Sequence, residues 1–282
     1  RYKNIRKKVL SVTVTSTFDE GLNDANFQFN NMYMSGYALL KTESSGSPLK
    51  GLSLWDGHVN KRIGGVGAAV SVWKKAGIPT HEIRPLGKGE IKYSTIPTFI
   101  SCKVEEYLCM MFADVKGYSK LAGEQLILFT KHFMGRCDEI VSQYDEHVVV
   151  RRSQGDGFFL AFTSLEVAIK VSIKIKEMMS ATDWHELGLP AGLIARFALD
   201  AGPCYSFRDP ISRQIDLAGA HVIRAARLEQ VTPPGYIFAS ESFASLCAVN
   251  KVAGEFELAG QVQLPKNHGE MRVYFLNVKQ TP

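Results

Sequence analysis

Residues 153–159 read Ser-Gln-Gly-Asp-Gly-Phe-Phe, and this stretch decides the fold of the larger part of the chain. The segment Gly155-Asp156-Gly157 separates two apolar runs, 147–151 and 158–162. A short glycine-containing turn between two such runs predicts a β-hairpin. The sequence therefore places the carboxylate of Asp156 in a tight turn between two strands.

A second carboxylate, Asp114, ends an earlier apolar strand that we expect over residues 105–114. Nearly continuous apolar residues are typical of a central strand that is buried on both faces. If the sheet brings Asp114 and Asp156 together, the pair forms a site for a hard divalent cation. Mg²⁺ usually binds one or two carboxylates together with substrate phosphates.

The composition is that of an ordinary globular protein. The chain has 282 residues, a length sufficient for two domains. Of these residues 45% are hydrophobic and 22% are charged. The net charge of +5 fits a phosphate-bearing ligand without requiring nucleic acid. The five scattered cysteines form no Cys-x-x-Cys pair, which favours a reducing, cytoplasmic location. With so mild a charge we expect no nucleic-acid partner. No apolar stretch reaches the ~18 residues of a membrane span, so we expect no span.

The chain divides near residues 85–103, where prolines and glycines predict a linker. We expect an α/β region of unknown role over 1–90, as part of a larger domain, and a second domain over 104–282. In the first region the pattern predicts, in order, a helix over 24–40, a strand over 49–55, a helix over 65–77 and a strand over 80–83. Glycines 64, 65 and 67 at the second helix start could cradle a phosphate, but a tight turn before a packed helix is favoured.

The second region predicts an α+β fold. Its expected elements are the strand 105–114, a helix 119–144, strands 147–151 and 158–162, a helix 165–179, a strand 193–200, a helix within 215–230, a strand 236–239, a helix from 240, and strands 255–264 and 271–277. One stripe of the first helix carries Leu126, Phe129, Phe133, Cys137 and Ile140. The order β-α-β-β-α-β with an appended helix and strand is a ferredoxin-like core.

Residues 104–278 resemble the catalytic domain of class III nucleotidyl cyclases. The resemblance is carried by five blocks in the same order: Leu-Cys-Met-Met-Phe-Ala-Asp-Val-Lys-Gly-Tyr-Ser from 108, Ser-Gln-Gly-Asp-Gly-Phe-Phe from 153, Arg-Phe-Ala-Leu-Asp-Ala-Gly-Pro from 196, Asp-Leu-Ala-Gly-Ala-His-Val-Ile-Arg-Ala-Ala-Arg-Leu-Glu from 216, and Gly-Glu-Met-Arg-Val-Tyr-Phe from 269. One block alone would be weak, but five in order are specific.

The resemblance implies an enzyme that converts a nucleoside triphosphate into a 3′,5′-cyclic nucleotide and pyrophosphate. Asp114 and Asp156 match the two metal-binding aspartates, and the carbonyl of Val115 matches an additional ligand. Two Mg²⁺ or Mn²⁺ ions per site would polarise the attacking 3′-hydroxyl and neutralise the triphosphate. The family also implies a head-to-tail homodimer with active sites at the interface.

The second protomer would supply the remaining groups of each site. Arg227 matches the arginine that stabilises the α-phosphate transition state, and Arg272 occupies the position of a triphosphate-binding lysine. Arg152 and Asp216 match the two base-reading positions. For each arginine, the alternative is a surface salt bridge without a catalytic role.

Three positions depart from the usual family pattern. Ile223 stands where an asparagine usually contacts the ribose, four residues before Arg227, so it shares that helix face without a hydrogen-bonding group. Arg152 can only donate hydrogen bonds, which suits the carbonyl groups of pyrimidines and disfavours guanine. Together with Tyr118, which narrows the cleft, Arg152 resembles bacterial pyrimidine cyclases of phage defence.

Three functions remain open from the sequence. A pyrimidine cyclase would use UTP or CTP for antiviral signalling, and an adenylyl cyclase would use ATP, because arginine can also donate to adenine N1. The third is a degenerate module that binds a nucleotide and dimerises without catalysis, which Ile223 favours. Residues 219–235 and 49–83 also resemble bacterial cyclases that carry an upstream α/β domain.

Overall fold

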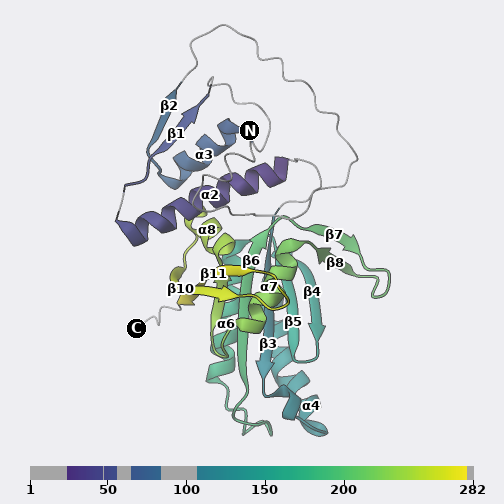
Figure 1. Cartoon of the computed structure of the whole chain (residues 1–282). Helices are drawn as coiled ribbons and strands as arrows, with labels where there is room; N and C mark the ends of the chain where they lie inside the picture. Colours follow the sequence, from purple (N-terminus) through teal and green to yellow (C-terminus); the bar gives the residue numbers. More distant parts are fainter. Residues whose placement is uncertain (1–23, 47, 56–64, 84–106, 278–282) are drawn as a thin grey trace.

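The computed structural model describes residues 24–46, 48–55, 65–83 and 107–277. Its centre is a seven-stranded mixed sheet, shown in Figure 1. In spatial order the strands are β10 (Glu255–Gln263), β11 (Glu270–Asn277), β9 (Ile237–Ser240), β6 (Ile194–Gly202), β3 (Leu108–Lys116), β5 (Gly157–Phe162) and β4 (Val148–Gln154). The predicted central strand, β3, pairs with β5 on one side and with β6 on the other.

The order β6-β3-β5-β4, antiparallel throughout, is that of a βαββαβ core, so the predicted α+β, ferredoxin-like fold is confirmed. The helices of the core are α4 (Glu124–Phe129), α5 (Gly135–Ser142) and α6 (Leu165–Ala181). The appended part follows as α7 (Ala220–Val231), strand β9, α8 (Glu241–Asn250) and the β10–β11 hairpin. None of the described helices is long and apolar enough to cross a membrane.

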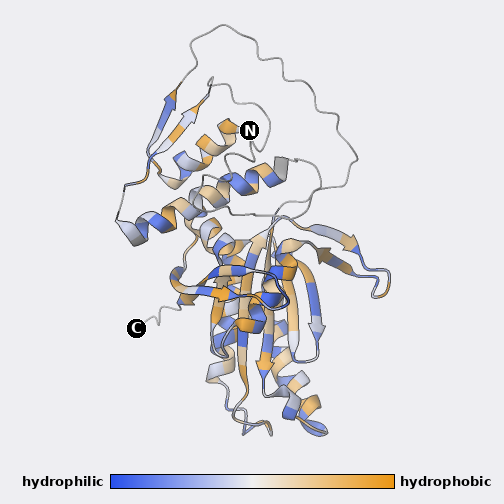
Figure 2. Cartoon of the chain, viewed as in Figure 1, coloured by the Kyte–Doolittle hydropathy of each residue, from blue (hydrophilic) through white to orange (hydrophobic). Residues whose placement is uncertain are grey.

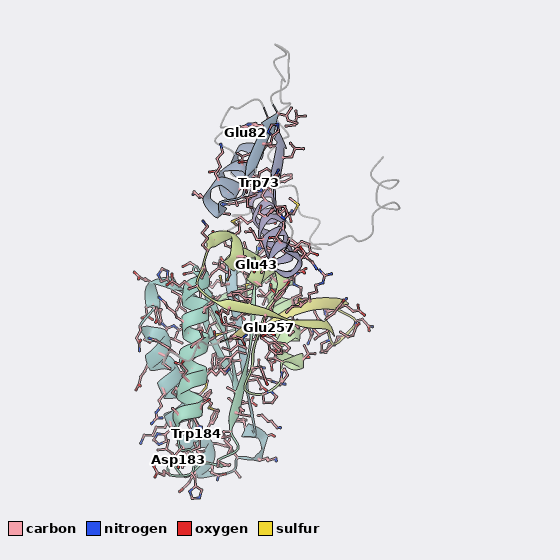
Figure 3. All side chains as sticks on the ribbon, turned by 90° about the vertical axis from the view of Figure 1, so that its left-hand side faces the viewer. Glu43, Trp73, Glu82, Asp183, Trp184 and Glu257 are labelled. Carbon is pink, nitrogen blue, oxygen red and sulfur yellow. The ribbon has the colours of Figure 1, made fainter. Side chains whose placement is uncertain are left out.

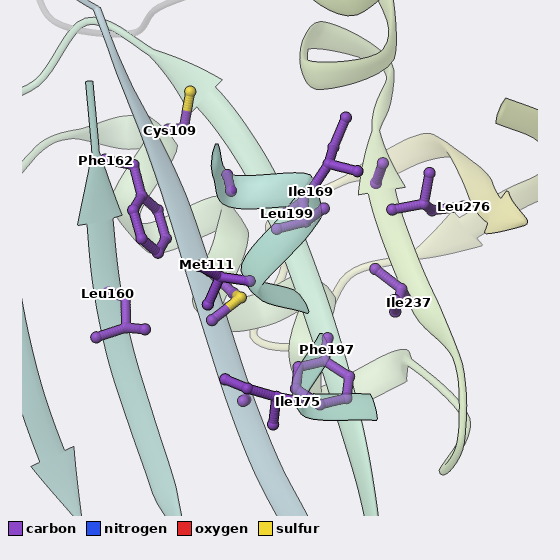
Figure 4. Close-up of a cluster of buried hydrophobic side chains, with 14 of the residues drawn as sticks. Cys109, Met111, Leu160, Phe162, Ile169, Ile175, Phe197, Leu199, Ile237 and Leu276 are labelled. Atoms are coloured by element: carbon purple, nitrogen blue, oxygen red, sulfur yellow. The ribbon is translucent and has the colours of Figure 1, made fainter. Parts of the chain in front are cut away.

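Alternate residues of β3 face opposite sides of the sheet, because side chains alternate along a strand. Met111 packs in the larger core with Ile175 of α6 and Phe197 of β6, as Figure 4 shows. Met110, on the other face, packs with Ala225 of α7. Colouring by hydropathy in Figure 2 shows hydrophobic residues along these central strands. Helices α5, α6 and α8 thus cover one face of the sheet, and α7 packs on the other together with Cys204 and Leu217.

The N-terminal region contains the predicted parallel α/β unit. Its elements are α2 (Asp24–Ser45), β1 (Gly51–Leu54), α3 (Val66–Ala76) and β2 (Thr80–Ile83), and β1 pairs with β2 in parallel. Gly77 ends α3 in the left-handed conformation that glycine favours, as its place before Ile78-Pro79 predicts. A side chain on Gly67 would lie 3.0 Å from the ring of Trp55, which supports the packing interpretation of this glycine. Gly64 lies outside the described residues.

Helix α2 joins this region to the cyclase-like domain, since it contacts both α3 and α8. Phe29 and Tyr33 of α2 belong to the same buried cluster as the central strands. Figure 3 shows Trp73 of α3 above this junction and Trp184 at the opposite end of the molecule. The boundary predicted between residues 90 and 104 falls outside the described residues and stays a prediction.

The helix predicted over 119–144 is confirmed from Glu124 to Ser142, but it begins later than predicted and contains a π-helical turn. The segment begins with a 3₁₀ turn, Tyr118–Lys120, and continues through α4, a π-helical turn at Thr130–Met134 and α5. Phe129, Phe133 and Cys137 are buried as predicted, and Ile140 packs against the same core. Leu126 is exposed instead, because it lies in the first turn of a helix that begins only at Glu124.

The helix predicted within residues 215–230 is confirmed as α7 (Ala220–Val231), but the residues before it are not helical. Residues Ile215–Ala218 form a strand, β8, which pairs with a strand that the sequence pattern did not reveal, β7 (Tyr205–Arg208). The helix begins only after Gly219, whose φ of 150° belongs to a backbone conformation that favours glycine. In Figure 1 the β7–β8 hairpin projects from the body of the domain as an arm.

A buried ion pair ties α7 and α8 to the sheet. Asp200 of β6 is 0% exposed and accepts hydrogen bonds from Arg224 Nε at 3.0 Å and from the hydroxyls of Ser240 and Ser242, both at 2.6 Å. Burial alone would raise the pKa of Asp200, but Arg224 and His221 outweigh it and hold that pKa well below its usual range. The carboxylate is therefore ionised inside the fold.

We expect Asp200→Asn to lower the free energy of unfolding at pH 7 by about 3–5 kcal/mol, because it leaves the partly buried guanidinium of Arg224 without its counter-charge. The pKa of Asp200 is lower in the folded state than the value near 4 of an unfolded chain, so its contribution is complete above about pH 4 and is lost as the pH falls through the folded-state value. Urea unfolding at pH 7 and pH 3 measures the difference, which should shrink at the lower pH.

Asp138→Asn is the matched control, because Asp138 pairs with Arg151 on an exposed surface. Exposed pairs contribute about 0–1 kcal/mol, so this variant should remain close to the wild type. Equal, small losses in both variants at pH 7 would contradict the role of Asp200.

Candidate active site

The candidate site lies on the sheet face that α7 covers only in part. Asp114 lies two residues after Phe112 and four after Met110 on β3, so its side chain faces the same side of the sheet as theirs. Across the ladder Asp114 stands opposite Arg196 of β6. The strand register therefore brings one carboxylate and one guanidinium together near the end of β3.

The β4–β5 turn brings the second carboxylate to Asp114. Gln154 pairs with Gly157, so Gly155 and Asp156 form a two-residue turn. Gly155 has a φ of +65°, the positive value that the first residue of a type II′ hairpin turn requires. Gly157 runs so close to β3 that an added Cβ atom would lie 2.8 Å from the carbonyl oxygen of Ala113. The turn is thereby held against the end of β3.

Asp156 and Asp114 interact directly. Partial burial and the neighbouring Asp114 carboxylate raise the pKa of Asp156, because two carboxylates side by side oppose each other's ionisation. The structure thus brings together the two predicted metal ligands. The side chain of Val115 is buried in the opposite face, so only its backbone carbonyl is left to serve as the predicted additional ligand.

Arg196 and Glu229 complete this cluster, and neither was predicted as a site residue. Arg196 donates to Asp114 Oδ2 from Nε at 2.9 Å and from Nη2 at 2.6 Å, and its Nε also lies 2.6 Å from Glu229 Oε1. Burial, with the charges of Asp114 and Asp156, raises the pKa of Glu229 to about 7 despite the opposing effect of Arg196. Arg196 opens one of the five sequence blocks, which is the signal that could have identified it.

The two predicted base-reading residues form a second cluster. Arg152 Nη1 donates to Asp216 Oδ2, and the guanidinium carbon lies 5.0 Å from the ring centroid of Phe159. The other oxygen of Asp216 accepts from the backbone N–H of Leu217 at 2.8 Å. Arg152 lies opposite Phe159 in the β4–β5 ladder, so this pair occupies the same sheet face as Asp114.

The remaining predicted residues lie around these clusters. Tyr118 packs edge-on against Phe129 with ring centroids 5.0 Å apart, and a Cβ atom on Gly155 would lie 3.8 Å from its ring. On α7, Ile223 is 43% exposed, and Arg227 has a buried Nε without a hydrogen-bond partner in the described part of the chain. The structure therefore places Tyr118 beside the aspartate turn.

Arg272 has contacts of a different kind. Its Nη1 donates to the hydroxyl of Tyr37 at 2.7 Å and lies 3.3 Å from Glu241 Oε1. Among the described residues, no hydrogen bond or ion pair joins Arg152, Arg227 or Arg272 to Asp114 or Asp156. A single chain thus brings together the carboxylates but not the predicted phosphate-binding arginines.

A model of the adenylate and guanylate cyclase catalytic domain matches residues 100–278, which is more than half of the chain. The chain belongs to this family. It is a nucleotidyl cyclase, a lyase that cyclises a nucleotide, as the five sequence blocks implied. No curated protein matches the chain.

Solved cyclase structures share the fold. The adenylyl cyclase CyaB from P. aeruginosa has a TM-score of 0.54 and 19% identity, over 62% of this chain and 95% of that chain. The guanylate cyclase domain of RhGC from Catenaria anguillulae, in complex with GTP, has a TM-score of 0.52 and 17% identity, over 61% and 96%. Identities this low support the fold alone.

The paired aspartates fit a hard divalent ion. Both are oxygen ligands near the end of β3, and their mutual repulsion is relieved when a cation lies between them. The described residues contain no group of three or more His, Cys, Asp or Glu side chains placed to hold a metal. Two carboxylates are the number of protein ligands that suits a metal ion shared with substrate phosphates.

We expect Asp114→Asn and Asp156→Asn each to weaken Mn²⁺ binding by more than about tenfold in the presence of pyrophosphate. Removing a direct ligand should cost at least as much as removing its hydrogen-bonded support. Electron paramagnetic resonance of free Mn²⁺ measures the binding, and Glu257→Gln, an exposed carboxylate on β10, is the control. Unchanged binding in both aspartate variants would contradict the metal assignment.

Proposed function

We propose that the chain forms a 3′,5′-cyclic nucleotide from a nucleoside triphosphate at the Asp114–Asp156 site, and that it does so as a homodimer. The observation that carries this proposal is the convergence of the two aspartates on a sheet face that α7 leaves partly uncovered. The 3′-hydroxyl oxygen attacks the α-phosphorus and releases its proton to solvent, the bond from that phosphorus to the bridging oxygen of the β-phosphate breaks, and pyrophosphate leaves. Two Mg²⁺ or Mn²⁺ ions, when bound, supply charge neutralisation at the attacking and leaving oxygens.

Homodimerisation is proposed because one chain does not assemble a whole site. Among the described residues, no hydrogen bond or ion pair joins Arg227 or Arg272 to Asp114 or Asp156 of the same chain, so we propose that a second copy supplies these arginines to an assembled site. Large apolar side chains are exposed where this copy would pack, including Ile211 at 93% and Ile215 at 49% on the β7–β8 arm. One solved relative is described as a non-canonical dimeric guanylyl cyclase domain.

The chain's own residues would then act by binding and orientation. Arg227 would bind the α-phosphate and Arg272 the remaining phosphates of the substrate. Arginine is suited to both roles, because its planar fork matches phosphate oxygens and keeps its charge at all physiological pH values. With no protein nucleophile in this scheme, the rate enhancement comes from positioning and from charge stabilisation.

For the base we propose a pyrimidine, UTP or CTP. The Arg152–Asp216 pair offers donors from the guanidinium beside an acceptor carboxylate, which suits a base edge with carbonyl oxygens and one N–H group. Phe159 beneath the guanidinium restricts its orientation. Tyr118 beside the aspartate turn leaves less room for a two-ring base. Antiviral signalling is proposed on the same likeness to phage-defence cyclases.

One other substrate has specific support. The same donor and acceptor could meet N1 and the exocyclic amine of adenine, which would make the chain an adenylyl cyclase. At Ile223 an exposed apolar side chain replaces a ribose-binding group and adds to the apolar surface on which a second copy would pack. A cytoplasmic location is proposed because the described cysteines, Cys109, Cys137, Cys204 and Cys247, are free thiols inside the fold.

Incubation with each of the four nucleoside triphosphates and Mn²⁺ or Mg²⁺, followed by mass spectrometry, tests the reaction. We expect a cyclic pyrimidine nucleotide as the main product and least turnover of GTP. Arg152→Ala should reduce the preference among bases more than it reduces inhibition by pyrophosphate, because it removes base contacts only. GTP as the best substrate would refute the role of Arg152, and ATP as the best would favour the adenylyl alternative.

Mixing two inactive variants tests the shared site. Asp114→Ala removes a metal ligand and Arg227→Ala removes a phosphate ligand, so each homodimer should have lost activity. A mixed dimer contains one intact site and should recover up to about one quarter of wild-type activity, since half of randomly paired dimers are mixed and each has one site of two. No recovery despite measured subunit exchange would place each site within one chain.

A further inference from the structure

The surroundings of Arg272 link the proposed phosphate site to the N-terminal region. Arg272 Nη1 donates to Tyr37 Oη at 2.7 Å, and its guanidinium carbon lies 5.8 Å from the ring centroid of Tyr37. Glu241 of α8 lies 3.3 Å from the same Nη1. Tyr37 belongs to α2, so a residue far away in the sequence contacts a proposed substrate-binding residue.

The position of Tyr37 is fixed by close packing of α2 on α8. At Gly36 an added Cβ atom would lie 1.7 Å from the carbonyl oxygen of Ser245, so the two backbones touch where no other residue fits. The rings of Tyr33 and Tyr37 stack with centroids 6.2 Å apart. On another side of α2, Trp73 of α3 donates to Ser35 Oγ at 2.9 Å.

Glu241 is oriented by the same helix. Tyr33 donates to Glu241 Oε2 at 2.7 Å, while Oε1 faces Arg272. Burial, followed by the hydrogen bond to Glu241, raises the pKa of Tyr33, so its hydroxyl stays a neutral donor. The two tyrosines of α2 therefore act on Arg272 in two ways, directly through Tyr37 and through Glu241 from Tyr33.

These contacts leave part of the guanidinium available. A guanidinium carries five N–H groups, and both contacts described above use Nη1. In the described residues, Nη2 and Nε have no hydrogen-bond partner, and 39% of the side chain is exposed. Arg272 is thus anchored at one nitrogen and keeps donors that can bind phosphate oxygens, as expected of an arginine held in place for a ligand.

We propose, on the basis of the cyclase function proposed above, that Tyr37 is a positioning residue for Arg272. Helix α2 would then form part of the triphosphate-binding site, because it fixes the guanidinium before the substrate arrives. Binding energy that would otherwise be spent on ordering a long side chain is retained in the complex. The N-terminal region thereby contributes to phosphate binding without touching the substrate.

The test compares Tyr37→Phe, which removes the hydroxyl and keeps the ring, with Ser35→Ala, which removes a hydrogen bond of the same helix on the side facing α3. We expect Tyr37→Phe to raise the inhibition constant of pyrophosphate and the KM of the preferred triphosphate by about three- to tenfold, the net effect of one typical hydrogen bond. Ser35→Ala should leave both unchanged. Thermal unfolding and circular dichroism verify that each variant folds.

A double-mutant cycle separates positioning from general destabilisation. In an Arg272→Ala background, Tyr37→Phe should have no further effect on pyrophosphate binding, because the residue through which it acts is gone. Wild-type constants in Tyr37→Phe, or the same loss in both backgrounds, would overturn the inference. If Tyr37→Phe does not fold, Glu241→Gln takes its place in the cycle, since it weakens the second contact to the same Nη1.

The proposed function can fail separately. A wild-type chain that forms no cyclic product from any triphosphate contradicts catalysis, and calorimetry with pyrophosphate and Mn²⁺ then measures the effect of Tyr37→Phe directly. A wild type that does not bind pyrophosphate would overturn the role of Tyr37 as well.

Discussion

The pairing of β3 with β5 and β6 is the interaction on which the rest of the structure depends. Its register sets Asp114 opposite Arg196 and Phe112 opposite Phe159, and it holds the Gly155–Gly157 turn against Ala113. A shift of this register by one residue would move every one of these side chains to the other face. The same strands supply the buried core, so the site is as stable as the centre of the sheet.

Two ion-pair clusters lie on that sheet face, and they have different roles. The ion pair of Asp200 and Arg224 joins β6 to α7 and stabilises the fold. The more accessible cluster of Asp114, Arg196 and Glu229 lies where a ligand can enter, and its carboxylates have interdependent charges. Helix α7 supplies a residue to each cluster, Arg224 to the first and Glu229 to the second, and it also carries Arg227.

The sequence predicted the strands and the pair of aspartates because these signals are local. An apolar run bounded by glycine predicts a strand, and the Asp156 turn follows from its own neighbours. Arg196 and Glu229 were missed because their roles come from strand pairing and from the packing of α7. Two other elements were not predicted. The π-helical turn at Thr130–Met134 keeps a nearly helical apolar period, and the β7 strand is only four residues long. Tyr37 could not be predicted, because its partner lies 235 residues away.

The contact at Gly36 has a consequence for how cyclases of this kind are combined with other domains. Because the backbones of α2 and α8 meet there without space for a side chain, the surface of α8 is shaped for this one helix. Fusion of residues 104–282 to an unrelated sensor would leave that surface without its complement. The catalytic domain and helix α2 therefore have to be transferred together, although they are separate along the chain, and α3 belongs with them because it contacts both α2 and α8.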